Sequence, residues 1–510
     1  MARLSNYFAV LLFFPYLSLG SQRGLKTTPP LPIAPLPSAK QLAWQQGEMA
    51  MFFHFGMNTF TDSEWGLGRE NPSIFSPTAL DARQWVASAV AAGFSRVVLT
   101  AKHHDGFCLW PSSYTNYSVR SSPWLDGEGD VVAELAAAAK EFGIDLGLYL
   151  SPWDRHEPSY GKTLEYNEYY LGQMTELLTL YGDIQEVWLD GAGKTDMVYL
   201  FDTWFQLIHQ LQPKALIFSE AGPDCRWSGN ENGIAGTTCW SLFNKSSAVI
   251  GGTETQYSLK GDPYGHDWVA PECDVSIRKG WFWHSSEHPK SPMDLLDIYY
   301  KSVGRNCLLI LNIPPNSSGL LPDEDLQVLR NFTALQKSIF SHNLAKDALV
   351  LASSTRGGPE ESQFSPSNVV QEGIYTYWAP DELQTNWTLV LNFGQSVSFN
   401  VLQAQEPIQL GQRVIEFHVD VLLEGGWEMI ASGTTIGYKR ILLFPMVKVQ
   451  FLRFVIDKSR ADPPLVSHLS VYVDPFSAAG NPHGSSRSTF DIFEPSKNTQ
   501  VSINSLHSSL

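Results

Sequence analysis

Residues 81–107, DARQWVASAVAAGFSRVVLTAKHHDGF, contain the pattern that decides the fold. Residues 81–92 have the helical spacing of apolar side chains, and Gly93 follows them as a typical helix end. Residues 96–100 form a short apolar run that predicts a buried strand, and polar residues follow that run at once. This order of helix, strand and polar strand end predicts one unit of an α/β fold.

The same alternation extends over residues 40–342. Strands are predicted at 49–55, 144–150, 184–189, 215–219 and 307–313, and helices at 130–142, 167–181, 197–212, 293–303 and 324–340. Such a pattern fits a parallel sheet covered on both faces, either open or closed. The length suits eight βα units, and no GxGxxG follows the first strand to indicate a dinucleotide fold. We therefore predict a (β/α)8-type TIM-like barrel as the catalytic domain.

Residues 343–475 have a different pattern, with short alternating strands separated by turn residues. Strands are predicted at 373–377, 387–393, 413–423, 427–432, 439–444, 447–456 and 469–473. This spacing predicts a C-terminal antiparallel β-sandwich. Residues 476–510 are rich in Ser, Asn and Pro, which predicts a disordered tail. The sequence leaves open whether the sandwich binds a ligand or braces the barrel.

The N-terminus predicts export. Residues 1–20 combine Arg3, an apolar run at 8–14 and a small-residue exit, as signal peptides do, and residues 21–39 form a Pro-rich lead-in. The apolar run is too short to span a bilayer, and no later segment is long enough. We expect a secreted, extracellular protein, which in a plant means the apoplast or cell wall. Five glycosylation sequons agree with this route: Asn116, Asn244, Asn316, Asn331 and Asn386.

The overall charge narrows the partners. The formal net charge is −17, and this negative field repels phosphate backbones and anionic membrane surfaces. We expect neither nucleic acid nor a membrane as a partner, and the oligomeric state stays open. Five cysteines without a CxxC pair argue against a zinc cluster and allow up to two disulfides, whose pairing the sequence does not define.

The residues at the strand ends raise two possible chemistries, a metal site and a serine hydrolase. The adjacent His103 and His104 suggest a metal site, but neighbouring side chains on a strand diverge, and no HExxH motif completes such a site. A serine hydrolase needs a GxSxG elbow, which follows none of the predicted strands. We therefore expect no metal and no cofactor.

Two carboxylates follow neighbouring predicted strands. Asp190 directly follows the strand at 184–189, and Glu231 lies past the next strand. A turn or helix-cap role is the simpler explanation of Asp190 taken alone. However, the active site of a TIM barrel lies at the carboxyl ends of its strands, and the neighbouring strand ends carry His, Tyr, Trp and Arg. Paired carboxylates beside aromatic residues are what the cleavage of a glycosidic bond requires.

Several motifs resemble those of glycoside hydrolase family 29, the retaining α-L-fucosidases. They are HFGMNTF (54–60), EWG (64–66), AKHHDGF (101–107), LGLYLSPWDRH (146–156), VWLDGA (187–192), RWSGNENG (226–233) and PECDVSIRKGWFWH (271–284). The last two resemble the subfamily that prefers α-1,3 and α-1,4 linkages, in a plant-like secreted form. The C-terminal sandwich is similar to the galactose-binding-like modules that often follow these barrels.

The resemblance implies roles for individual residues. It makes Asp190 the nucleophile, and Glu231 is our choice of acid/base, with Glu272 and Glu64 as alternatives. We expect the pKa of Glu231 to be raised so that it holds its proton, and retention requires the two carboxyl groups to lie about 5 to 5.5 Å apart. The expected sugar-binding residues are His54, Glu64, Trp65, His103, His104, Tyr149, Arg226, Glu272 and Trp281.

The implied function is hydrolysis of terminal α-L-fucose from oligosaccharides or N-glycans by double displacement. Two alternatives remain at this point. One is a secreted, catalytically inactive, lectin-like protein, and the other is a glycosidase with a different sugar specificity. An assay for free fucose separates the first of these from the enzyme, and the same assay with galactosides tests the second.

Overall fold

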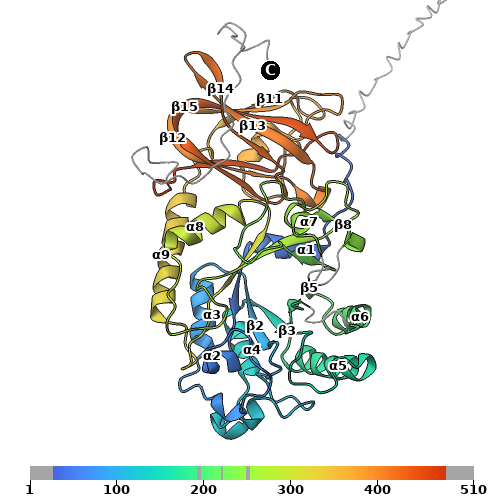
Figure 1. Ribbon diagram of the computed structural model, residues 1–510. Helices are drawn as coiled ribbons and strands as arrows, with labels where there is room; N and C mark the ends of the chain where they lie inside the picture. The colour runs from blue at the N-terminus through green and yellow to red at the C-terminus, as the bar shows by residue number, and fades with distance from the viewer. Residues whose placement is uncertain (1–26, 192–196, 220–221, 248–252, 478–510) are drawn as a thin grey trace, which may run out of the picture.

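The computed structural model describes residues 27–191, 197–219, 222–247 and 253–477. The chain forms a barrel and a C-terminal sheet domain that lies over one end of it (Figure 1). The predicted signal peptide and all but two residues of the predicted tail lie outside the described residues. Among the described helices, none combines the length and apolar character needed to cross a membrane.

Eight parallel strands close the barrel, which confirms the predicted TIM-like fold. Their order around the barrel is β1-β10-β9-β6-β5-β4-β3-β2. Every residue of β1, β2, β9 and β10 is buried, which explains why most of these strands read as continuous apolar runs. The strands are β1 (Met49–Phe53), β2 (Arg96–Lys102), β3 (Asp145–Leu150), β4 (Glu186–Trp188), β5 (Leu216–Phe218), β6 (Cys225–Trp227), β9 (Ala270–Ser276) and β10 (Leu308–Asn312).

Helices follow most of these strands on the outside of the barrel. Asp81 and Asp130 cap α3 and α4 by accepting hydrogen bonds from backbone N–H groups, so each helix begins one residue later than predicted. The helices are α1 (Ala39–Gln46), α2 (Met57–Thr61), α3 (Ala82–Ala91), α4 (Val131–Phe142), α5 (Thr163–Leu180), α6 (Phe201–Leu211), α7 (Thr255–Lys260), α8 (Pro292–Lys301) and α9 (Asp323–Phe340). A small hairpin-like pair, β7 (Leu242–Phe243) and β8 (Asp267–Trp268), completes this part.

The C-terminal domain is built on an antiparallel sheet with two very long strands. Its order is β11-β12-β15-β13-β14, and β16 pairs with the second half of β12. The first half of β12 pairs with β11 instead. The two halves of β12 therefore lie in different parts of the sheet. Side chains from both parts enter one hydrophobic cluster. The strands are β11 (Leu349–Ala352), β12 (Trp387–Gln405), β13 (Val414–Leu423), β14 (Gly426–Thr434), β15 (Arg440–Ser459) and β16 (His468–Tyr472).

Two strand predictions in this domain are wrong in detail. Residues 373–377 form bends rather than a strand. The two strands predicted at 439–444 and 447–456 are one strand, β15, which passes through Pro445. Its register against β12 shifts between Leu443 and Val447, on either side of that proline. A proline, which has no N–H to donate, is tolerated at such an irregularity.

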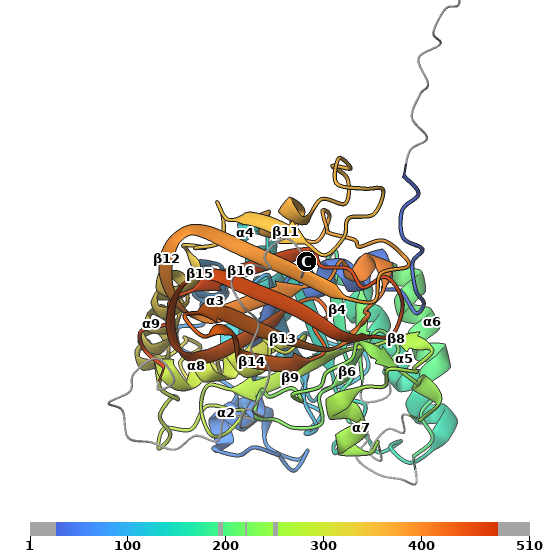
Figure 2. The ribbon, with the colours of Figure 1, turned by 90° about the horizontal axis from the view of Figure 1, so that it is seen from above.

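The sheet domain packs against the end of the barrel where the strands begin. Asn306, just before β10, donates its backbone N–H to Lys439 O at 2.9 Å, and Glu48, just before β1, accepts from the Tyr438 hydroxyl at 3.0 Å. Lys439 also forms an ion pair with Glu48. Figure 2 shows β12 and β15 crossing over this end of the barrel. The opposite end, where the strands finish, is therefore free of the sheet domain.

The Pro-rich lead-in runs along the sheet domain. Ile33 donates its N–H to Leu410 O at 3.0 Å, and the Arg413 guanidinium donates to Leu31 O at 2.6 Å. The first described residues are thus held by the last domain of the chain.

Candidate active site

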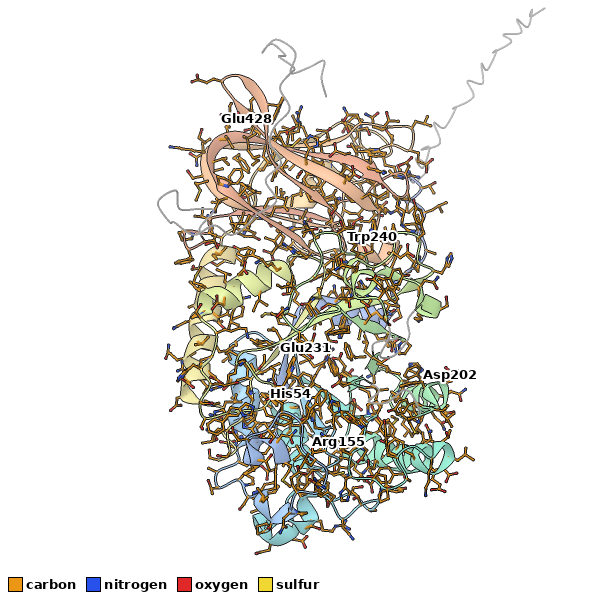
Figure 3. The ribbon with its side chains drawn as sticks, viewed as in Figure 1. His54, Arg155, Asp202, Glu231, Trp240 and Glu428 are labelled. Carbon is orange, nitrogen blue, oxygen red and sulfur yellow. A yellow bond between two sulfur atoms is a disulfide. The ribbon has the colours of Figure 1, made fainter. Side chains whose placement is uncertain are left out.

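A cavity of about 160 Å³ opens where the barrel strands end. Asp190 and Glu231 both line it, from the segments that follow β4 and β6. Figure 3 shows Glu231 and His54 together in the barrel half of the molecule, far from Glu428 in the sheet domain. The lining residues are Phe52, His54, Trp65, His103, His104, Trp188, Asp190, Phe218, Trp227, Glu231, Asp274 and Trp281.

One of the two carboxylate oxygens of Asp190 accepts a hydrogen bond. The Tyr149 hydroxyl donates to Asp190 Oδ2 at 2.8 Å, and His104 Nε2 lies 3.5 Å from the same oxygen. Tyr149 itself is fully buried in the barrel, and burial raises the pKa of its hydroxyl, with the charge of Asp190 adding to the effect. It therefore stays a neutral donor. Among the described residues, no hydrogen bond to Asp190 Oδ1 is present, so this oxygen is the more available one.

Hydrogen bonds fix which ring nitrogen of His54 and His103 carries the proton. Asn312 donates its amide N–H groups to Ser276 and Trp281, so its Oδ1, 2.9 Å from His54 Nδ1, accepts from that nitrogen. In neutral His54, Nε2 is then an acceptor. The reverse holds for His103, because Asn58 Nδ2 donates to His103 Nδ1 at 3.3 Å and leaves Nε2 as the donor.

His104 has the same tautomer as His54. The Ser151 hydroxyl donates to Trp153 O at 2.6 Å, so its oxygen accepts from His104 Nδ1 at 2.7 Å. Burial lowers the pKa of all three imidazoles, to about 3 for His54, and their mutual charges add to this for His54 and His103. His103 thus offers a donor and His54 an acceptor to the cavity, a pair that matches sugar hydroxyl groups, whereas His104 Nε2 faces the Asp190 carboxylate.

Glu231 lies across the cavity with a raised pKa. Desolvation raises it, the 3.3 Å hydrogen bond from the Trp281 indole N–H opposes that shift, and the charges of Asp190 and Glu64 raise it further. A carboxyl group poised to hold its proton beside an ionised one is the arrangement that general acid catalysis needs.

Asp274 is a third carboxyl group of this cavity, and the sequence analysis missed it. It is buried on β9, and Trp227 donates its indole N–H to Asp274 Oδ1 at 2.9 Å. Burial raises its pKa well above the ordinary value, and the charge of Glu231 adds to the shift. The raised pKa favours the protonated form of Asp274, which can donate a hydrogen bond into the cavity.

Glu272 differs from the expectation that it binds sugar. It shares a strand face with Asp274, two residues closer to the start of β9, and so lies a layer deeper inside the barrel. It is fully buried beside Glu186 and Cys225 and does not line the cavity. Burial raises its pKa well above the ordinary value, and the neighbouring Glu186 adds to that shift.

Arg226 also differs from the expectation. Its guanidinium is fully buried away from the cavity, where it donates to the backbone carbonyls of Ser258, Val269 and Trp240. It therefore anchors the segments around β7 and β8 instead of contacting a ligand in the cavity.

The remaining predicted residues lie at the cavity mouth. Trp65 is 60% exposed and packs edge-on against His104 and Trp153, and Trp281 lines the wall next to His54. Glu64 is not a lining residue, since its carboxylate accepts hydrogen bonds from the backbone N–H groups of Trp281 and Phe282.

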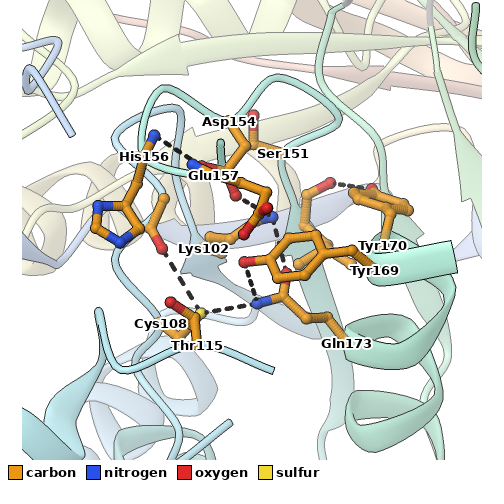
Figure 4. Close-up of polar contacts among 12 residues, drawn as sticks. Lys102, Cys108, Thr115, Ser151, Asp154, His156, Glu157, Tyr169, Tyr170 and Gln173 are labelled. Carbon is orange, nitrogen blue, oxygen red and sulfur yellow. Dashed lines mark hydrogen bonds and ion pairs between the residues drawn. The ribbon is translucent and has the colours of Figure 1, made fainter. Parts of the chain in front are cut away.

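A buried ion pair supports the strand ends beneath the histidines (Figure 4). Lys102, the last residue of β2, donates to Asp154 Oδ2 and to Gln173 Oε1, both at 2.9 Å, and neither charged side chain is exposed. The other Asp154 oxygen accepts from the backbone N–H groups of His156 and Glu157. The loop after β3 is therefore tied to the strand that carries His103 and His104.

Two groups of described residues bring three metal-ligand atoms within 4.8 Å of one another. His103, His104 and Asp190 form the first, and they also form the wall of the cavity. Glu186, Cys225 and Glu272 form the second, but Arg96 lies 3.2 Å from Glu186 and already supplies a positive charge there.

The cysteines form one disulfide, Cys273–Cys307, which joins β9 to the start of β10. Cys108, Cys225 and Cys239 are free and buried. Only one of the two disulfides that the cysteine count permits is present.

Comparisons with known proteins point to one family. A family model described as Alpha-L-fucosidase matches residues 44–337. The Arabidopsis thaliana protein named alpha-L-fucosidase 1 is 62% identical over 489 residues, which is 94% of this chain and 95% of that protein. The crystal structure of SpGH29 has a TM-score of 0.84 at 40% identity and covers 87% of this chain and 100% of its own. A Ruminococcus gnavus GH29 fucosidase in complex with fucose has a TM-score of 0.81 at 34% identity, covering 88% and 98%.

Proposed function

The chain belongs to the alpha-L-fucosidase family, and we propose that it removes terminal α-L-fucose with net retention, using Asp190 as nucleophile and Glu231 as acid/base. The observation that carries this proposal is that both carboxyl groups line one cavity with three neutral histidines. The pKa of Glu231 is raised while Asp190 is held by a hydroxyl donor, as the two roles require.

In the first step, Asp190 Oδ1 attacks the anomeric carbon while the bond to the leaving oxygen breaks. Tyr149 keeps Oδ2 occupied and so orients Oδ1 toward the sugar. The proton of Glu231 passes to the leaving oxygen, which departs as an alcohol. The product is a covalent β-fucosyl ester of Asp190.

In the second step, the ionised Glu231 takes a proton from water as the water oxygen attacks the anomeric carbon. The ester bond breaks and the Asp190 carboxylate is restored, with its negative charge again stabilised by Tyr149. Two inversions give α-fucose, and Glu231 ends with the proton that it held at the start.

The nucleophile is tested with Asp190→Gly. We expect hydrolysis of an aryl α-L-fucoside to be lost and azide to restore turnover, giving β-fucosyl azide because only one inversion remains. Glu176→Gln changes a carboxylate outside the cavity and is the matched control variant, prepared and assayed in the same way. Normal turnover by Asp190→Gly without azide would remove Asp190 from this role.

For the substrate, we propose fucose linked α-1,3 or α-1,4 on branched oligosaccharides or N-glycans. The support is the resemblance of the segments at 226–233 and 271–284 to that subfamily. A panel of trisaccharides with 1,2, 1,3, 1,4 and 1,6 linkages tests it by release of free fucose. Preferred cleavage of the 1,2 or 1,6 isomer would overturn the linkage proposal while leaving the fucosidase activity intact.

We also propose that the protein is secreted, on the basis of the signal-peptide pattern at residues 1–20. Expression of the full chain in plant cells, followed by fucosidase assay of the extracellular wash and the cell extract, tests this. Activity confined to the cell extract would contradict it.

A further inference from the structure

The loop after β9 is fastened to the loop after β1 through Glu64. Glu64 Oε2 accepts from the Trp281 N–H at 2.8 Å, and Oε1 accepts from the Phe282 N–H at 3.1 Å. Oε1 also lies 2.6 Å from His284 Nε2. Both oxygens of this carboxylate are therefore engaged by the residues of one turn.

His284 is shared between two carboxylates. Its Nε2 faces Glu64, and its Nδ1 lies 2.7 Å from Asp62 Oδ1. A neutral imidazole donates only one hydrogen bond, whereas an imidazolium donates to both partners. Burial lowers the pKa of His284, but the hydrogen bonds to Asp62 and Glu64, with the charges of Glu64 and Glu287, outweigh it and leave the pKa raised.

Gly280 leaves room for the close contact between the Glu64 carboxylate and the turn. A Cβ at residue 280 would lie 2.5 Å from Glu64 Oε1 and 3.0 Å from His284 Cδ2. The absence of a side chain there lets the Glu64 carboxylate reach the backbone of the turn. The Gly280 N–H is used as well, donating to Glu287 at 2.8 Å.

The turn held in this way carries Trp281, which touches the reacting groups. Its indole N–H donates to Glu231 Oε2 at 3.3 Å, its ring lies 4.9 Å from that of His54, and its carbonyl accepts from Asn312 Nδ2 at 2.8 Å. Among the described residues, Trp281 is the only side chain hydrogen-bonded to Glu231. The position of Trp281 therefore sets where the Glu231 carboxyl group sits.

We propose that Asp62, Glu64 and His284 form a clasp that positions Trp281 and, through it, the Glu231 carboxyl group. The three clasp residues are positioning residues, and Glu64 is not the proton donor. The proposal rests on the proposed function in one respect, namely that Glu231 is the acid/base.

Glu64→Gln tests the clasp with two substrates. A 4-nitrophenyl fucoside has a leaving group that needs little protonation, whereas a fucosylated trisaccharide needs a well-placed acid. We expect kcat for the trisaccharide to fall by about 10- to 100-fold, and kcat for the aryl fucoside to fall much less. His284→Gln should give the same pattern, and Glu428→Gln on the sheet domain should match wild type with both substrates.

The pH profile supplies a readout that simple loss of stability does not change. The Trp281 indole lowers the pKa of Glu231, so losing that hydrogen bond raises the pKa further and the acid form persists to higher pH. We expect Trp281→Phe and His284→Gln to move the alkaline limb of kcat/KM in the same direction, to higher pH, whereas Glu64→Gln also removes a charge that raises the pKa of Glu231 and so is not used for this comparison. Trp281→Phe keeps the turn intact and so carries the test if Glu64→Gln does not fold.

Azide separates failure of the clasp from failure of the acid/base assignment. A variant that lacks the acid/base is rescued by azide with retained configuration, giving α-fucosyl azide. We expect this product from Glu231→Gln and not from Glu64→Gln. Rescue of Glu64→Gln instead would overturn both proposals. Rescue of Glu231→Gln, together with a wild-type substrate ratio in Glu64→Gln and a wild-type pH profile in His284→Gln, would overturn the clasp alone.

Discussion

At the scale of single residues, the position of a side chain along its strand decides whether it reaches the cavity. Glu272 and Asp274 both point into the barrel, but only Asp274 is far enough along β9 to line the cavity. The motif containing both residues was recognised in the sequence. The motif does not show how deep each residue lies in the barrel, because the register of β9 depends on its neighbours β6 and β10. Arg226 was misassigned for a similar reason, since a three-residue strand is too short to reveal its inward face.

The raised pKa of Asp274 leads to a prediction. Since burial raises its pKa well above the ordinary value, the neutral amide of Asp274→Asn should replace it with a kcat/KM loss of less than about 10-fold. Asp274→Ala should lose more, because the Trp227 indole N–H is left without its acceptor. Steady-state kinetics with a fucosylated trisaccharide compares the two. Equal losses would mean that the ionised form of Asp274 is the one required.

The buried His54 predicts how stability depends on pH. Its pKa is about 3 in the folded protein and 6.5 in the unfolded chain, so the unfolded state binds the extra proton between these values. Its contribution to stability is complete above pH 6.5 and is lost as pH falls toward 3, by about 1.4 kcal/mol per pH unit.

Replacement of His54 measures that contribution. Between pH 7 and pH 5, the free energy of unfolding should fall by roughly 2 kcal/mol less in His54→Gln than in wild type. Urea denaturation at the two pH values gives the difference, and His342→Gln, at an exposed position, is the control. An unchanged pH dependence in His54→Gln would show that the imidazole is not kept neutral.

At the scale of elements, the sequence predicts what lies inside each segment better than where two segments meet. The helices at α3 and α4 were located to within one residue, because capping aspartates and terminal glycines are local signals. The strands β6 and β9 were not predicted. β6 has three residues, and β9 carries Pro271, Glu272 and Asp274 at positions that only the barrel interior accommodates.

The Lys102–Asp154 pair connects two such elements and predicts a large loss of stability when it is broken. Asp154→Asn leaves the Lys102 charge buried without its partner, so the free energy of unfolding should fall by about 3 to 5 kcal/mol. The double variant Lys102→Met/Asp154→Asn should recover part of this loss, since no unpaired charge remains. Chemical denaturation of the single and double variants measures the effect, and a double variant less stable than Asp154→Asn would contradict it.

At the scale of the whole molecule, the hydrophobic core of the barrel extends into the sheet domain. Ile441, Val401 and Tyr472 of the sheet domain belong to the same hydrophobic cluster as the barrel residues. The sequence indicated two domains by their different strand patterns. It did not indicate their joint core, because contacts between segments so distant in the chain leave no local pattern.

The shared core predicts that the two domains unfold together. We expect a single transition in calorimetry, and we expect a chain ending at residue 342 to be insoluble or unfolded, because it exposes the apolar end of the barrel. Solubility and circular dichroism of the truncated chain test this. A folded, active barrel without the sheet domain would contradict it.

The packing of the lead-in against the sheet domain has a practical consequence for how the protein is oriented on a solid support. The described chain enters at Thr27 and leaves at Ser477, and both residues belong to the half of the molecule remote from the cavity. A tether attached at Thr27 or Ser477, to a bead or to a polysaccharide matrix, would leave the catalytic opening directed outward. Bulky branched glycans could then approach an immobilised enzyme without meeting its support.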